Sequence, residues 1–79
     1  MQKPLQILQA AIGKPVAVAL RSSSEVRGVL DGFDPHLNLV IKDAKELENG
    51  KEVARHPMTV VRGDSVAYIS RIEADDGSR

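Results

Sequence analysis

The chain has 79 residues, eleven of them basic, eleven acidic and none cysteine, so its formal net charge is zero. This length predicts a single domain, and the missing cysteines exclude disulfides and thiolate metal sites. A chain without net charge does not bind nucleic acid through its overall electrostatic field, so RNA binding would require a shaped pocket or a local basic patch.

A short helix is predicted over residues 4–12, where apolar residues recur at helical spacing. Pro4 suits the first helical position, and Gly13 suits the position just past the end. The apolar face consists of Leu5, Leu8 and Ile12. A helix this short is marginal by itself, so we expect that face to pack on a sheet.

Beyond the helix the apolar pattern changes to a period of two, which indicates β-strands. The strands are predicted over residues 16–20, 25–34, 37–44, 53–61 and 65–70. In the second strand, Gly28 and Gly32 lie on one face, which marks a close approach or a strong bend. Because a sharply curved strand can serve two halves of a small barrel, the pattern favours a mainly β fold of that kind.

Turn signals separate these strands. Asn49-Gly50 is the strongest of them and predicts the tip of a charged hairpin between the third and fourth strands. Pro57 assigns the middle of the fourth strand to a sheet edge or a bulge, because proline cannot donate to the ladder. Arg62-Gly63-Asp64 forms a tight connection to the last strand, and residues 73–79 are expected to be a disordered tail.

Three hydrogen-bonding side chains alternate just before the apolar run of the third strand: Asp34, His36 and Asn38. Each alone has a plainer interpretation. Asp-Pro is an ordinary turn opener, and a lone histidine beside a strand is usually a solvated loop residue. An asparagine among apolar residues needs a partner, which a local backbone group could supply.

Two motifs in the same chain order make the sequence resemble the Sm and Sm-like family, with its archaeal branch the most similar. The first motif lies over residues 13–44 and includes Gly28 and the stretch from Asp34 to Asn38. The second lies over residues 60–70, with Arg62-Gly63 as its signature. The resemblance implies a short N-terminal helix followed by a strongly bent five-stranded antiparallel β-barrel that assembles into a ring. It places the whole domain over the segment 1–72.

The resemblance also implies that such rings contain usually seven and sometimes six identical subunits. The last strand of one subunit would pair with the fourth strand of its neighbour. The residues support self-association independently, because exposed strand edges invite another copy and a head-to-tail contact closes into a ring or continues as a filament. Pro57 is the departure from the family that bears on this contact, since it removes one backbone donor from the fourth strand.

By the resemblance, single-stranded uridine-rich RNA binds at the inner rim of the pore. The residues assigned to it are His36, Asn38, Arg62, Gly63 and Asp64, with Asp34 behind them. The Asn38 amide oxygen can accept from uracil N3–H while its nitrogen donates to O4, and Asp34 could prevent the flip that cytosine would need. His36 would stack on the base, and Arg62 would lie against its opposite face or hold the loop. Gly63 would let backbone approach, and the Asp64 N–H could donate to O2.

No enzymatic activity, cofactor, metal or membrane partner is expected, and a cytosolic protein acting in RNA processing, stability or chaperoning is predicted. RNA-processing proteins are candidate further partners. Two alternatives stay open. Asp34, His36 and Asp64 could form a hydrolytic or metal site, although no activated nucleophile or full ligand set accompanies them. A purely structural oligomer or protein adaptor would form a ring without preference for uridine.

Overall fold

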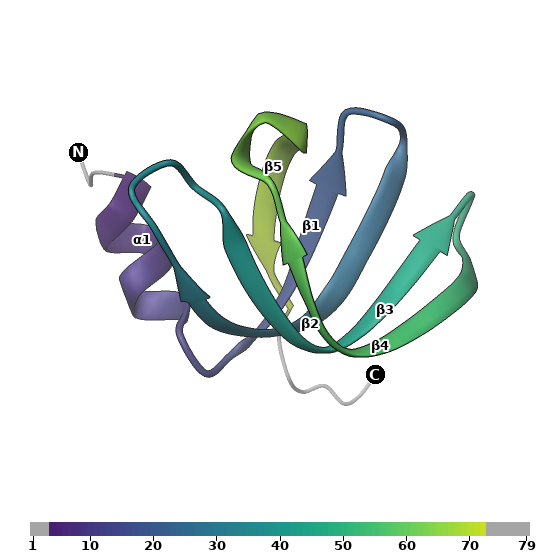
Figure 1. The fold of residues 1–79 in the computed structure, drawn as a ribbon, viewed down its shortest axis with the longest axis horizontal. Coiled ribbons are helices and arrows are strands. Elements are labelled where there is room, and N and C mark those ends of the chain that lie inside the picture. The colour runs from purple at the N-terminus through teal and green to yellow at the C-terminus, as the bar shows by residue number, and fades with distance from the viewer. Residues whose placement is uncertain (1–3, 73–79) are drawn as a thin grey trace.

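The computed structural model describes residues 4–72, and within them one helix and five strands follow the predicted order (Figure 1). The elements are α1 Pro4–Ala11, β1 Pro15–Leu20, β2 Ser24–Phe33, β3 Leu39–Glu48, β4 Lys51–Val61, the 3-10 turn η1 Gly63–Ser65, and β5 Val66–Arg71. The predicted tail over residues 73–79 lies outside the described residues.

The five strands form one antiparallel sheet in the order β4-β3-β2-β1-β5. Figure 1 shows β2, β3 and β4 sweeping through a deep curve, so the sheet is rolled rather than flat. β4 and β5 are its two edges, and neither edge has a further partner strand within residues 4–72. The predicted fold class, a short helix followed by a strongly bent five-stranded antiparallel sheet, is confirmed. The sheet is curved like a barrel, but β4 and β5 do not pair with each other, so the barrel is open.

One cause of the curve lies where Gly28 of β2 faces Asp43 and Ala44 of β3. The pairing register shifts there, so that two residues of β3 face one residue of β2. Asp43 takes a left-handed φ of 51°, and the bulge directs Ala44 into the core. A Cβ on Gly28 would lie 2.6 Å from both Ile41 Cγ2 and the Lys42 carbonyl oxygen. The predicted close approach is therefore confirmed at Gly28.

Gly32 differs from Gly28. A Cβ at Gly32 would have no neighbouring atom within 4 Å, so no close approach requires glycine there. A second register shift between β2 and β3 lies between Leu30 and Gly32. Gly32 therefore lies next to an irregularity in the pairing of β2 with β3, not at a close backbone contact.

The core fills the inside of the roll and is aliphatic. Its buried members are Leu8, Ala11, Val16, Val18, Val26, Leu30, Leu39, Ile41, Ala44 and Val61. Among residues 5–11 of α1, Leu8 and Ala11 are the buried members, because a short helix presents a narrow apolar face to the sheet. The predicted apolar face is correct for Leu8 alone, since Leu5 and Ile12 are 40% and 36% exposed. Ile12 lies beyond the last residue of α1.

The β3–β4 hairpin is tighter than expected. Glu48 pairs with Lys51, so Asn49 and Gly50 form a two-residue turn with φ values of 53° and 79°. Two positive φ angles are those of a type I′ turn, which confirms the turn signal. Both strands consequently extend closer to the tip than predicted. β4 continues through Pro57 and lies at a sheet edge, as the proline predicted.

Candidate functional site

One carboxylate builds the turn between β2 and β3. Asp34 Oδ1 accepts hydrogen bonds from the backbone N–H groups of His36, at 2.9 Å, and of Asn38, at 3.0 Å. The Asp34 carbonyl accepts from the Leu37 N–H at 2.9 Å, and Leu37 takes a left-handed φ of 65°. β3 therefore begins at Leu39, two residues later than predicted, because the turn uses both preceding residues. Leu37 still packs against the core.

The same contacts fix the charge of Asp34. The hydrogen bond from the Asn38 side chain lowers the pKa of Asp34 below its ordinary value of 3.8, and the backbone N–H groups of Asn38 and His36 lower it further. The carboxylate is therefore ionised at neutral pH and accepts hydrogen bonds at both of its oxygens.

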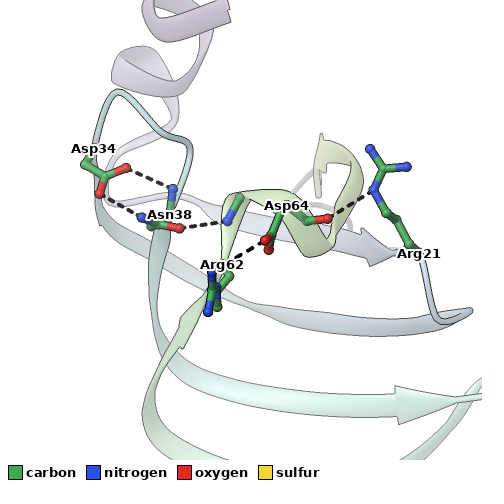
Figure 2. Close-up of polar contacts among 6 residues, drawn as sticks. Arg21, Asp34, Asn38, Arg62 and Asp64 are labelled. Carbon is green, nitrogen blue, oxygen red and sulfur yellow. Dashed lines mark hydrogen bonds and ion pairs between the residues drawn. The ribbon is translucent and has the colours of Figure 1, made fainter.

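The side-chain amide of Asn38 is held from two sides, as Figure 2 shows. Its Nδ2 donates to Asp34 Oδ2 at 3.0 Å. Its Oδ1 accepts from the Gly63 backbone N–H at 2.8 Å. These two contacts assign the amide orientation, and they leave one amide hydrogen and one lone pair of Oδ1 for another partner. The contact with Asp34 is the one that sequence reasoning expected, and the contact with Gly63 is not.

Gly63 brings the two motif segments into direct contact. A Cβ on this residue would overlap the carbonyl oxygen of His36 and lie 3.1 Å from the Leu37 carbonyl carbon. The close approach seen at Gly63 is to the turn before β3, and the approach of its backbone to a bound base stays a prediction. Only glycine allows the η1 segment to lie this close to that turn.

Arg62 and Asp64 flank Gly63 and face solvent. Arg62 Nη2 lies 3.4 Å from Asp64 Oδ2, and their side chains are 77% and 72% exposed. Such a contact on the surface contributes little, so the Arg62 guanidinium is free to take another partner. The Asp64 carbonyl is held from the other side by Arg21, whose Nε donates to it at 3.1 Å (Figure 2).

Arg21 contacts the η1 segment beside the candidate site, and sequence reasoning did not identify this contact. It follows β1 and precedes a serine turn, where a basic residue is unremarkable. The residue that it contacts lies 43 positions away, so no local spacing could indicate the contact. Only the pairing of β1 with β5 brings the β1–β2 turn to η1.

A surface hollow of about 470 Å³ opens beside the Asn38 amide. It is lined by Phe33, Asp34, Asn38, Val40, Val60 and Arg62. Its lining is half apolar and half polar, and a mixture of apolar surface with convergent polar groups is typical of ligand-binding sites. The His36 side chain is exposed and makes no hydrogen bond or ion pair with residues 4–72, so the structure places it on the same turn without joining it to the amide.

The alternative set of Asp34, His36 and Asp64 is not gathered into a metal site. Within the described part of the chain, no group of three or more His, Asp or Glu side chains could hold a metal ion. In the same residues, no helix has the length and apolarity needed to cross a membrane.

Comparison with known proteins gives a consistent result. The family model of the LSM domain matches residues 6–71. A protein of Archaeoglobus fulgidus named "Putative snRNP Sm-like protein" is 44% identical over 68 residues, which cover 86% of this chain and 88% of that protein. A protein of the same name from Methanosarcina acetivorans is 46% identical over 68 residues, covering 86% and 94% of the two chains.

Solved structures agree with the sequence comparisons. The Pyrococcus abyssi Sm protein in complex with a uridine heptamer superposes with a TM-score of 0.88 at 39% identity, over 90% of this chain and all of that one. A heptameric archaeal Sm protein superposes with a TM-score of 0.79 at 44% identity, over 86% and 98% of the two chains. The turn before β3 and the η1 segment both lie within the matched family domain.

Proposed function

This chain belongs to the LSM domain family of Sm-like proteins, and we propose that it forms a homo-oligomeric ring that binds single-stranded uridine-rich RNA without acting as an enzyme. We assign seven subunits to the ring, with six as the alternative, because one matching archaeal Sm protein is a heptamer. The bound uridine heptamer of the Pyrococcus abyssi protein supports the choice of RNA. RNA processing, stability or chaperoning in the cytosol is the role that we infer for such a ring.

The fixed amide of Asn38 is the observation that carries this proposal. Uracil presents a donor at N3 between acceptors at O4 and O2. The remaining lone pair of Asn38 Oδ1 matches N3–H, and the remaining hydrogen of Nδ2 matches O4. Asp34 acts behind this contact, since both of its oxygens are occupied by the turn and by the amide.

Discrimination against cytosine follows from the same geometry. Cytosine has an acceptor at N3 and a donor at N4, so it would need the Asn38 amide turned over. A flipped amide would lose its hydrogen bonds to Asp34 and Gly63. It would also place its oxygen against the Asp34 carboxylate and its NH₂ group against the Gly63 N–H. Breaking each hydrogen bond costs about 1 kcal/mol at a half-buried site, so the flip costs roughly 2 kcal/mol, or about thirtyfold in affinity.

Base stacking completes the proposed site. Arg62 is exposed, lines the hollow beside Asn38 and has only a weak surface contact with Asp64. We assign it to one face of the bound base, and the exposed His36 ring to the other. Gly63 and the Asp64 backbone N–H stay as the proposed contacts to O2. Stacking contributes on the order of 1–3 kcal/mol per base, so one site alone binds weakly.

The edges of β4 and β5, which pair with no further strand in the described part of the chain, support ring assembly. Large apolar side chains are exposed on both strands, with Met58 and Val60 on β4 and Tyr68 on β5 at 53%, 63% and 66% exposure. Pairing β5 of one subunit with β4 of the next is a head-to-tail contact that can close into a ring. A ring repeats the site around one pore, and linked sites multiply affinity through effective concentration.

Fluorescence anisotropy with labelled heptamers of uridine, cytidine and adenosine tests the proposal, with native mass spectrometry to count the subunits. We expect a closed ring that binds the uridine heptamer most tightly and leaves it intact. A ring with equal affinity for the three heptamers would indicate a structural oligomer or adaptor. RNA cleavage that His36→Ala abolishes would indicate an enzyme.

A further inference from the structure

Arg21 is anchored to the η1 segment through two hydrogen bonds. Its backbone N–H donates to the Ser65 carbonyl at 2.9 Å, and its Nε donates to the Asp64 carbonyl at 3.1 Å. The backbone bond holds the residue against η1 and the Nε bond orients its guanidinium beside the proposed RNA site, although Arg21 belongs to the β1–β2 turn. In Figure 2, Asp64 lies between Arg62 and Arg21 and contacts both.

The positive charge of Arg21 has no acidic partner in the described part of the chain. Carboxylates pair there with Arg27, Arg55 and Arg62, but none pairs with Arg21. Its only side-chain hydrogen bond within residues 4–72 uses Nε and a neutral carbonyl, so both terminal Nη groups are free to donate. The residue is also exposed to solvent. Arg21 is thus an oriented cation with unused donors.

The charges of the proposed RNA site favour a further cation beside it. The assigned residues include the carboxylates of Asp34 and Asp64 and the guanidinium of Arg62, which gives a net charge of −1 when His36 is neutral. RNA carries one negative charge for each phosphate, and a ring repeats the site several times. Without a further cation, the phosphates of a bound strand would be repelled at each site.

We propose that Arg21 forms a phosphate subsite of the RNA-binding site, in which its two Nη groups bind the phosphodiester of the nucleotide whose base lies in the hollow beside Asn38. The inference rests on the proposed function and adds a contact to it. A guanidinium presents a planar fork of donors that matches two phosphate oxygens, and here Nε holds that fork in place. The strand then crosses the η1 segment at Asp64, with the base on the Arg62 side and the phosphate on the Arg21 side.

The test compares the wild-type ring with Arg21→Gln and with the matched control Arg27→Gln, using fluorescence anisotropy of a labelled uridine heptamer at several salt concentrations. Both variants remove one arginine charge, but Arg27 is paired with Glu25 on β2. We expect Arg21→Gln to weaken binding roughly tenfold or more, because the change repeats along the strand. The slope of log K against log salt should fall in magnitude by about 0.7 for each phosphate that the variant no longer binds. Arg27→Gln should change neither quantity.

A neutral-backbone probe sharpens the comparison. With a uridine heptamer whose phosphodiesters are replaced by methylphosphonates, the wild-type ring and Arg21→Gln should bind equally. Arg21→Lys keeps the charge without the fork, so it should keep the wild-type salt slope and bind more tightly than Arg21→Gln. Native mass spectrometry confirms that each variant forms the ring.

Several outcomes would overturn the subsite. Arg21→Gln could match Arg27→Gln, or it could weaken binding with an unchanged salt slope, which would mean that Arg21 only positions η1. A Lys variant with the reduced slope of the Gln variant would also contradict the proposal. A wild-type ring that does not bind the uridine heptamer would instead refute the proposed function, so the two failures are distinguishable.

Discussion

The backbone N–H of Gly63 donates to the side-chain oxygen of Asn38 at 2.8 Å across 25 residues of sequence. This hydrogen bond joins the turn before β3 to the η1 segment. The two parts of the proposed RNA site are thus one structural unit, so a substitution in one part is expected to alter the position of the other.

Replacing Asn38 by alanine should abolish the preference for uridine. The variant loses the donor and acceptor that match the uracil edge, and it leaves the Gly63 N–H without its acceptor at a cost of about 1 kcal/mol. We expect the uridine and cytidine heptamers to bind with similar affinity in anisotropy titrations, while native mass spectrometry still shows the ring. Dissociation of the ring would mean that Asn38 has a structural role instead.

His36→Ala and Arg62→Ala should weaken the binding of every heptamer without changing the order of preference. Both residues are assigned to stacking, which is nearly independent of the base and contributes about 1–3 kcal/mol per base. Anisotropy titrations with the uridine, cytidine and adenosine heptamers measure the effect. Arg27→Ala, which removes an arginine on β2, serves as the control and should leave binding unchanged. A selective loss of uridine binding would show that these side chains read the base edge.

Gly63→Ala should destabilise the protein and reduce RNA binding together. The added Cβ would overlap the His36 carbonyl, and forcing the two segments apart costs about 1–3 kcal/mol. For a domain of this size each kcal/mol lowers the melting temperature by roughly 4–8 °C. Gly32→Ala is the matched control, since its Cβ would have nothing within 4 Å, and its melting temperature should stay near the wild-type value. Equal melting temperatures for the two variants would contradict the tight contact.

Asp34 should make the turn before β3 sensitive to acid. Its pKa is lowered by the Asn38 side chain and by backbone N–H groups, so the ionised carboxylate favours the folded state. This contribution is fully present above the ordinary value of 3.8, and it is lost as pH falls through the lower pKa of the folded protein. Melting curves of the wild type and of Asp34→Asn from pH 7 to pH 2 should therefore converge in the most acidic samples. A constant difference across this range would exclude the carboxylate as its source.

Val60→Lys should prevent ring formation. The side chain is 63% exposed on the β4 edge strand, where the neighbouring subunit is proposed to bind, and a buried unpaired ammonium would oppose that contact. Ile7→Lys is the control, because Ile7 is similarly exposed at 49% but belongs to α1. Sedimentation velocity should show smaller species for Val60→Lys and a ring for Ile7→Lys. The opposite result would place the subunit contact on the helix.

The features predicted from sequence are those with local causes. Asn49 and Gly50 form their turn because their own backbone preferences favour positive φ. Gly28 was identified from its residue type within a strand pattern, although the atoms that exclude a side chain there belong to β3. The Asp34–Asn38 contact was also expected, since the two residues share one turn.

The features that sequence reasoning missed depend on how distant strands pair. The bulge at Asp43 has no glycine or proline on its own strand to indicate it, and it shifts the pattern of buried residues so that Ala44 points inward. The contacts of Arg21 and Gly63 exist only because β5 pairs with β1 and β4 with β3. The spacing of residues along the chain therefore does not predict either contact.

The two sheet edges, which have no partner strand within residues 4–72, have a consequence for the lone subunit. An isolated chain exposes two rows of backbone donors and acceptors, so association that covers them stabilises the folded form by mass action. Dilution would then lower the thermal stability of the protein, and newly synthesised subunits would be prone to improper strand pairing until enough copies accumulate. The concentration of the protein thereby becomes part of what determines its folding.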